Sequence, residues 1–391
     1  MTQLETLKPG WTKVKFGEVV RLCKDRSSDP AADGIERYVG LEHLEPEDLR
    51  IRRWGLVAEG TTFTSRFKPG QVLFGKRRAY QRKVAVADFE GVCSGDIYVF
   101  ESADQNHLLP ELLPFLCQTD RFFEYAVGTS AGSLSPRTNW NNLYNYELIL
   151  PQLEEQERIL KILINAQMLN ENIHEVLLRQ RTVKSSVIEE RAKHLCRSGT
   201  TKLKTIVKNI EAGKSPKSSG QVAAPGDFGV LKVSAVGDWE YCPNENKQIS
   251  DQDYLPDLEV KSGDFLATRA NADPNSVGRT CIVDYTPGNL MLSDKTWRIH
   301  LKNKAIIFGV LAWTKSSLFR QHILKNLSGT EAKNISQHRF LDGPFPSCSE
   351  SEFEEFSLDI MSLLLSETSL QSRYYETSRL FNLLINKTVG G

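Results

Sequence analysis

The sequence lacks the marks of several protein classes. Its seven cysteines are scattered singly and form no Cys-x-x-Cys pair, which indicates neither a disulfide framework nor a zinc knuckle. The seven histidines are dispersed as well. No stretch approaches the roughly 20 apolar residues needed to span a bilayer, and the first residues contain no apolar run that could serve as a signal peptide. We therefore expect a cytoplasmic chain that holds no metal.

Motifs of common catalytic and cofactor sites are missing too. Gly213-Lys214-Ser215 could end a phosphate-binding loop, but that pattern requires a glycine where Lys208 stands. No GxGxxG loop or GxSxG turn occurs. The acidic residues within 256–261 partly match the sequence pattern of a nuclease metal site. In such a site the acidic ligands stand on neighbouring strands and need more residues between them, so we interpret this match as chance. We expect a chain that is not an enzyme by itself and that binds no cofactor.

What the sequence does contain is a diverged internal repeat. With 391 residues the chain is long enough for two or three domains. Gly70 in KPGQVLF and Gly263 in KSGDFLA lie 193 positions apart, and Gly128-Thr129 lies 201 positions before Gly329-Thr330. Each match alone is weak. Their common order and near-equal offset predict that one half of the chain duplicates the other.

Two long helical patterns support this duplication. From Leu153 to Cys196 there is no proline or glycine, and apolar residues recur at alternating steps of three and four, as in coiled coils. A second pattern follows 194 positions later. The predicted seams are Ile159, Ile162, Ala166, Leu169, Ile173, Val176, Gln180, Val183 and Val187, and then Phe353, Phe356, Ile360, Leu363, Glu367, Leu370, Tyr374, Thr377, Phe381 and Leu384. Two core helices of separate domains are the alternative, although helices of about 40 residues exceed the usual globular length.

The predicted layout alternates globular parts and helices. The globular parts cover residues 1–152 and 199–348, and the helices cover 153–198 and 349–391. Each globular part mixes strand-like runs with helices, including predicted helices at Leu109–Tyr125 and Ala305–Asn326. The expected fold class is α+β, with two globular mixed α/β domains separated by two long helices.

Charge is balanced over the chain, at 49 basic and 49 acidic residues, but one loop is strongly cationic. It lies between two strand-like runs, and its candidate residues are Lys76, Arg77, Arg78, Tyr80, Arg82 and Lys83. Arginine can bond phosphate oxygens or the edge of guanine, lysine can bond phosphate, and an aromatic ring can stack on bases. A merely solvated basic hairpin is the alternative. Because this stretch contains no carboxylate, binding of an anionic ligand such as DNA explains it better.

Two further regions could contribute to DNA binding, with ordinary structural turns as the alternative. The loop Gly128–Trp140 offers small hydroxyl residues, a cation and an amide, and backbone groups in such loops suit phosphate. The candidates are Ser133, Arg137 and Asn139 in the first half, and Arg269, Asn271, Asn275, Arg279, Lys333, Asn334 and His338 in the second. Because the two sets differ, we expect the halves to read different sequences.

Three motifs resemble one family, the specificity subunits of Type I restriction–modification enzymes. They are GQVLF at Gly70–Phe74, SGDIYVF at Ser94–Phe100, and the junction ELILPQLEEQERI at Glu147–Ile159. The junction is the most specific of the three. The second junction, GPFPSCSESEFEEF at Gly343–Phe356, keeps the proline and the helix start but lacks the glutamate–glutamine pair.

The resemblance implies an assembly and its partners. Residues 1–152 and 199–348 would be target-recognition domains on double-stranded DNA, and the helices would pack as an antiparallel coiled coil. Two methyltransferase subunits would methylate adenine with S-adenosylmethionine. Two motor–nuclease subunits using ATP and Mg²⁺ could add DNA cleavage, so all cofactors would belong to partners. A non-catalytic coiled-coil scaffold that spaces two protein-interaction domains is the alternative.

Overall fold

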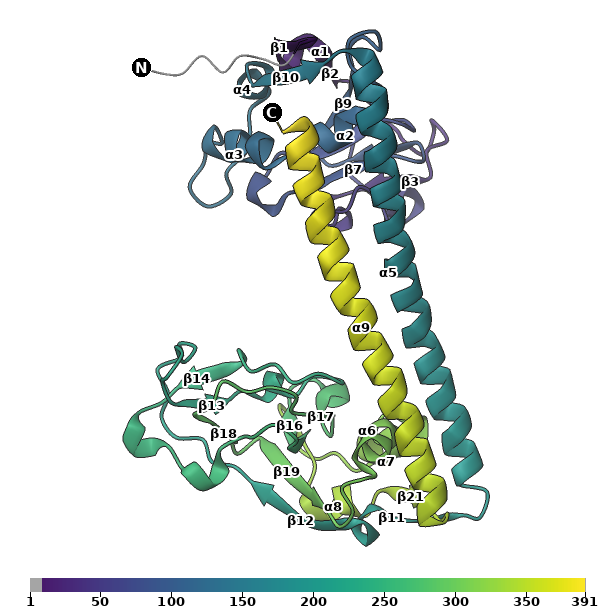
Figure 1. The fold of residues 1–391 in the computed structure, drawn as a ribbon, viewed down its shortest axis with the longest axis vertical. Coiled ribbons are helices and arrows are strands. Elements are labelled where there is room, and N and C mark those ends of the chain that lie inside the picture. The colour runs from purple at the N-terminus through teal and green to yellow at the C-terminus, as the bar shows by residue number, and fades with distance from the viewer. Residues whose placement is uncertain (1–8, 391) are drawn as a thin grey trace. The chain divides into compact units, whose positions relative to one another are not determined.

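The computed structural model describes residues 9–390, which leaves the start of the first predicted domain and the last glycine outside the described residues. The chain divides into two compact units (Figure 1). The first unit runs to Glu175 and resumes at Ser372, and the second unit is Val176–Gln371. Each unit therefore contains one globular part and half of each long helix. No helix within residues 9–390 is both long and apolar enough to cross a membrane.

The first unit is built on two four-stranded sheets. Their strand orders are β2 (Val20–Cys23), β9 (Ile97–Ser102), β6 (Val72–Gly75), β7 (Val84–Val86), and β4 (Gly55–Leu56), β3 (Arg37–Val39), β8 (Gly91–Cys93), β5 (Ser65–Phe67). The first sheet is antiparallel throughout, and the second contains one parallel pair, β3 with β8. A separate pair, β1 (Trp11–Lys15) and β10 (Glu147–Pro151), brings the two ends of the globular part together.

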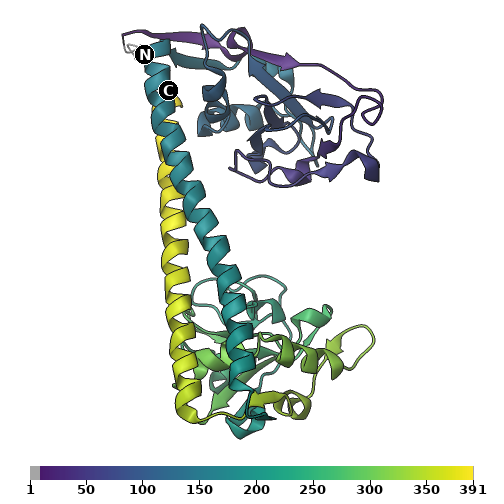
Figure 2. The same cartoon turned by 90° about the vertical axis from the view of Figure 1, so that its right-hand side faces the viewer.

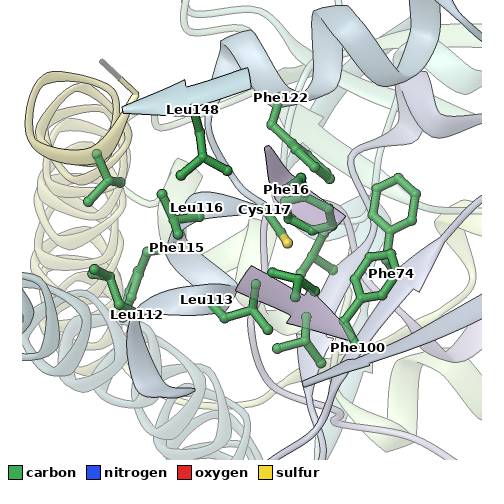
Figure 3. Packing of buried hydrophobic residues seen from close by; sticks show 14 of the residues in the cluster. Phe16, Phe74, Phe100, Leu112, Leu113, Phe115, Leu116, Cys117, Phe122 and Leu148 are labelled. Carbon is green, nitrogen blue, oxygen red and sulfur yellow. The ribbon is translucent and has the colours of Figure 1, made fainter. Parts of the chain in front are cut away.

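Short helices cover the antiparallel sheet of the first unit. They are α1 (Phe16–Val19), α2 (Leu113–Leu116), α3 (Asp120–Gly128) and α4 (Trp140–Tyr144). Phe16, Phe74, Phe100 and Phe122 are fully buried and pack edge to face or stacked in the core between sheet and helices (Figure 3). This aromatic core holds the end of β6, from which the cationic loop departs.

The second unit repeats the order of the antiparallel sheet and, with one strand fewer, that of the second sheet. Its strand orders are β12 (Val207–Ala212), β19 (Thr296–Leu301), β15 (Phe265–Thr268), β17 (Thr280–Ile282), and β14 (Asn246–Gln248), β13 (Gly229–Leu231), β18 (Leu290–Met291). The remaining elements are β11 (Thr200–Lys202) with β21 (Pro344–Pro346), β16 (Ala270–Asn271) with β20 (Lys333–Asn334), and helices α6 (Ile307–Trp313), α7 (Ser317–Lys325) and α8 (Gln337–Leu341). Gly70 and Gly263 both have φ of 86°, so the two matched glycines make the same turn. The shared topology bears out the predicted duplication.

The two helices predicted inside the globular parts are each broken. Leu109–Tyr125 forms α2 and α3, and Ala305–Asn326 forms α6 and α7. The break lies at a side-chain cap in both units: the hydroxyl of Thr119 accepts from the N–H of Phe122, and that of Ser316 accepts from Phe319. The prediction of single helices was wrong because apolar periodicity continues across a cap.

The long helices α5 (Leu153–Leu195) and α9 (Glu350–Val389) pack antiparallel within each unit (Figure 2). In the first unit Asn170 bonds Thr377, and one turn later His174 meets the ring of Tyr374. In the second unit Lys184 pairs with Glu367 and Arg191 with Asp359. Rising numbers on α5 thus meet falling numbers on α9, which confirms the predicted fold class.

The seam of α5 differs from the predicted one at alternate positions. Ile162, Leu169, Val176 and Val183 are about half exposed, at 51, 54, 48 and 52%. The buried residues lie one position later, at Leu163, Leu177 and Lys184. Two adjacent apolar rows run along α5, and steps of three and four fit both rows, so only packing against α9 selects one. The α9 seam was predicted more accurately, with Phe353, Phe356, Ile360 and Phe381 buried.

Candidate nucleic-acid interface

The cationic loop connects β6 to β7, as the sequence indicated. A single 3-10 turn, η3 (Ala79–Gln81), occupies its middle. Arg78 and Arg82 flank this turn with φ of 55° and 54°. Residues other than glycine rarely adopt this left-handed backbone region. Such conformations persist only where surrounding contacts hold them, and they concentrate at functional sites.

Main-chain bonds join the two predicted loops of the first unit. Arg77 and Arg137 form an antiparallel bridge. The N–H of Arg78 donates to the carbonyl of Pro136, and that of Thr138 donates to Lys76, both over 2.8 Å. Two loops separated by about 60 residues in the sequence therefore form one surface.

Asp96, which was not among the predicted site residues, lies beneath this surface. Its carboxylate accepts from Arg137 Nε at 2.7 Å and from Arg77 Nη1 at 3.3 Å. The hydrogen bond from Arg137, with a further one from Arg77, holds the pKa of the Asp96 carboxyl below its usual value. The sequence of the loop contains no carboxylate. In the structure, however, the carboxylate of Asp96, at the start of β9, lies against the loop.

Arg82 points into the first unit. Its guanidinium lies 3.0 Å from Glu47, 2.9 Å from Asp120, donates to the carbonyl of Gln118 at 2.7 Å, and stacks over the ring of Phe123 at 4.7 Å. These contacts occupy the side chain within the unit.

Lys83 and Lys76 are likewise engaged. Lys83 Nζ donates to the carbonyl of Leu41 at 2.7 Å. Lys76 Nζ lies 4.5 Å from the ring centre of Tyr98, and burial lowers the pKa of this ammonium. The more exposed candidates of the loop are Arg78 and Tyr80.

The second loop of the first unit contributes differently from expectation. Ser133 and Arg137 are exposed, and Ser135 accepts from both Arg77 and Arg78. Asn139 instead caps α4, where its side-chain oxygen accepts from the N–H of Asn141 at 3.0 Å. Asn139 therefore has a structural role, and its contact with DNA stays a prediction.

The second unit brings its candidates together through the same pairing. Strands β16 and β20 place Asn271 opposite Lys333 and Ala270 opposite Asn334. This pairing corresponds to the Arg77–Arg137 bridge of the first unit. Lys333 Nζ donates to the carbonyl of Gly329 at 2.8 Å, and Asn334 Oδ1 accepts from Ser328 at 2.9 Å.

The other candidates of the second unit surround this pair. Arg269 is exposed at the start of β16, and its carbonyl accepts from the N–H of Ile335. Asn275 is exposed on a 3-10 turn, η9 (Pro274–Ser276), and Arg279 is half-buried just before β17. His338 is 84% exposed, with Nε2 3.6 Å from Asp342. Within residues 9–390, no group of histidine, cysteine and acidic residues is arranged to hold a metal ion.

Residues 9–179 match the family model described as the Type I restriction modification DNA specificity domain. The match covers less than half of the chain. Together with the relatives below, it confirms the resemblance to specificity subunits of Type I restriction–modification enzymes.

Two curated relatives from Escherichia coli carry the same description. The EcoEI specificity subunit is 43% identical over 98 residues, which cover 25% of this chain and 16% of the relative. The EcoDI specificity subunit is 24% identical over 199 residues, 48% of this chain and 42% of the relative. The chain thus spans less than half the length of either relative.

Solved structures share the fold. The S subunit of a Type I restriction–modification system from M. genitalium superposes with a TM-score of 0.56 at 12% identity, over 100% of this chain and 98% of that one. A second solved chain comes from a structure of complex assembly and conformational transition in a type I R-M system. It superposes with a TM-score of 0.56 at 19% identity, over 98% of each chain.

Proposed function

We propose that this chain is the DNA sequence-specificity subunit of a Type I restriction–modification complex and reads a bipartite, asymmetric target. The observation that carries the proposal is the repeated loop pair. In the first unit the loop after β6 pairs by main-chain bonds with the loop after α3. In the second unit the segment after β15 pairs in the same way with the loop after α7. The scaffold is the same in both units while the side chains differ, as two unlike half-sites would require.

We infer that partner subunits dock on the long helices and perform the chemistry. Both units expose apolar side chains on these helices, by 48 to 63%. In the first unit they are Ile162, Met168, Leu169, Leu380 and Leu383, and in the second Val176, Leu178, Val183, Leu358 and Leu365. Exposed apolar side chains that gather on one surface mark protein interaction sites. We assign it to two methyltransferase subunits, with two motor–nuclease subunits in a complex that also cleaves DNA.

The cysteines support a non-catalytic role for this chain. A nucleophilic cysteine needs a lowered pKa. Burial instead raises the pKa of Cys93 and Cys281 to about 12, and it also raises that of Cys117. S-adenosylmethionine, ATP and Mg²⁺ would bind the partner subunits, whose action the chain would direct to its target.

The test is a methylome. Host DNA would be sequenced by a method that detects methylated adenine, with this gene and its neighbouring methyltransferase gene present and then with this gene deleted. We expect a split, asymmetric adenine-methylated motif that disappears on deletion. If the motif persists without this gene, another chain reads it, and the proposal fails.

A further inference from the structure

Each unit carries a short 3-10 turn at the same place in the fold. It lies in the connection between the third and fourth strands of each antiparallel sheet, as η3 between β6 and β7 and as η9 between β15 and β17. In each turn the middle residue is exposed: Tyr80, at 55%, and Asn275. The residue two positions before the following strand has a positive φ in both, Arg82 at 54° and Gly278 at 71°.

An inward-pointing arginine fastens each turn to the neighbouring helix. In the first unit Arg82 belongs to the loop itself and lies over Phe123 of α3 while pairing with Asp120 of the same helix. In the second unit the arginine is Arg320 of α7. Its Nη1 donates to the carbonyl of Val277 at 2.8 Å, and its Nη2 donates to the carbonyl of Asn275 at 3.0 Å.

The two arginines occupy opposite sides of one contact. Phe123 and Arg320 are each the fourth residue after their helix caps, Thr119 and Ser316. This helix position carries the ring of Phe123, on which Arg82 stacks, in the first unit. In the second unit it carries the arginine itself, Arg320. Where Arg82 holds a left-handed backbone, Gly278 adopts it without strain. Different residues thus hold a 3-10 turn at the same place in the two units.

Local contacts hold both turns further. In the first unit Ala79 is buried beside the exposed Tyr80, and the N–H of Glu47 donates to the carbonyl of Arg82. In the second unit the carboxylate of Asp273 accepts from the N–H of Asn275 and from the hydroxyl of Ser276. A residue presented on a turn held this firmly loses little freedom when it meets a ligand.

We propose that η3 and η9 are equivalent reading turns, in which Tyr80 and Asn275 each contact the bases of one half of the DNA target. Arg82 and Arg320 are positioning residues that hold these turns and do not touch DNA. This inference rests on the proposed function. An asparagine amide matches the major-groove edge of adenine, and a tyrosine ring offers an apolar face to the thymine methyl or to an unstacked base.

The first test uses Tyr80→Ala and Asn275→Ala in the assembled complex. Binding is measured to the target identified by the methylome, to DNA altered in either half, and to unrelated DNA. We expect each variant to lose about tenfold in preference for its own half of the target and to keep full preference for the other half. The dependence on salt should stay that of the wild type, because neither side chain carries a charge.

Matched controls come from exposed residues of the same types outside the turns. Tyr285 is 66% exposed, and Asn244 is exposed as well. Tyr285→Ala and Asn244→Ala should leave the preference for both halves unchanged. Equal losses in a control and its test variant would overturn the assignment of that turn.

The second test asks whether Arg82 holds the turn in place or contacts DNA itself. Arg82→Gly keeps a residue suited to the left-handed backbone but removes the guanidinium. We expect it to relax preference in the same half as Tyr80→Ala, with little further loss when the two are combined, because Arg82 acts through Tyr80. Arg82→Lys should restore part of the preference. As a control for assembly, the Arg82 variants should keep the wild-type preference for the other half of the DNA target.

Two outcomes would overturn the inference. If Arg82→Gly lowers the slope of log affinity against log salt by about one, Arg82 contacts a phosphate and is not a positioning residue. If the wild type prefers its target but neither Tyr80→Ala nor Asn275→Ala alters that preference, the turns do not read bases. A wild-type complex with no preference for any sequence would instead refute the proposed function itself.

Discussion

At the scale of single residues, Lys315 is a buried cation whose ionisation should be visible in stability. Its side chain is 9% exposed, with Nζ 2.7 Å from the carbonyl of Thr280 and 3.3 Å from Asp238. Burial lowers the pKa of Lys315 to about 8 from its usual 10.5. The folded state therefore releases this proton at a lower pH than the unfolded state does.

Between those two pKa values the unfolded state binds more protons, so stability rises with pH. Relative to Lys315→Met, the wild type should gain about 3 kcal/mol in free energy of unfolding from pH 7 to pH 10.5, at about 1.4 kcal/mol for each pKa unit. Chemical denaturation of both proteins across this range measures the difference. A difference that does not vary with pH would show that Lys315 is not desolvated in the fold.

Leu163 and Leu169 test which apolar row of α5 faces α9. Leu163 is fully buried and Leu169 is 54% exposed. Leu163→Ala should cost about 2–5 kcal/mol of unfolding free energy because it opens a cavity between the helices. Leu169→Ala should change stability by less than about 0.5 kcal/mol. Urea unfolding of the isolated chain compares them, and a larger effect at Leu169 would restore the seam predicted from the sequence.

At the scale of elements, the helix pair contains a buried ion pair. Lys184 and Glu367 are 6% and 12% exposed, lie 2.5 Å apart, and Lys184 also covers the ring of Trp239 at 4.1 Å. Glu367→Leu leaves the Lys184 ammonium buried and without its carboxylate, so it should cost about 3–5 kcal/mol. Lys184→Leu should cost less, because Glu367 also accepts from Arg181 Nε at 3.0 Å.

The double variant Lys184→Leu with Glu367→Leu should recover most of that loss, because a buried ion pair can be replaced by apolar side chains at little net cost. Guanidinium unfolding of the wild type, both single variants and the double variant completes the cycle. Additive losses would show that the two side chains are stabilised independently.

Elements were predictable to the extent that local pattern determines them. The long helices follow from periodicity over about 40 residues without proline or glycine, and their observed bounds are Leu153–Leu195 and Glu350–Val389. The phase of the α5 seam was not predictable, since it depends on contact with a helix about 200 residues away.

The candidate surface was predictable only in part for the same reason. The cationic loop is a local feature of the sequence, and it lies between strands β6 and β7, as the strand-like runs on either side predicted. Asp96 and Arg320 contact the loops from other elements, and no spacing in the sequence links them to Arg77 or Asn275. DNA contact by fifteen of the sixteen residues chosen from the sequence stays a prediction, and for the sixteenth, Arg82, we propose a positioning role instead.

At the scale of the whole molecule, a neutral chain that binds DNA must do so through local clusters of charge. The chain carries 49 basic and 49 acidic residues, yet Arg77 and Arg78 lie together on the paired loops beside Lys76. Replacing these three residues by alanine should reduce the slope of log affinity against log salt by up to about three, at about 0.9 for each phosphate that is no longer neutralised. Binding by the assembled complex across a salt series measures this slope.

The matched control replaces Lys161 and Lys193, two exposed lysines of α5, by alanine. The slope should then stay at the wild-type value. If the triple variant also keeps the wild-type slope, the cationic loop does not meet phosphate, and DNA must approach a different face of the first unit.

The exchange of Arg82 with Phe123 for Gly278 with Arg320 bears on how such a protein changes its target during evolution. Both units anchor the turn to the neighbouring helix, but the anchoring arginine lies on the turn in the first unit and on the helix in the second. The exposed middle residue takes no part in that anchoring through its side chain. If the turns read bases as we propose, new specificities are accessible by single substitutions at the exposed middle residue that leave the anchoring contacts in place.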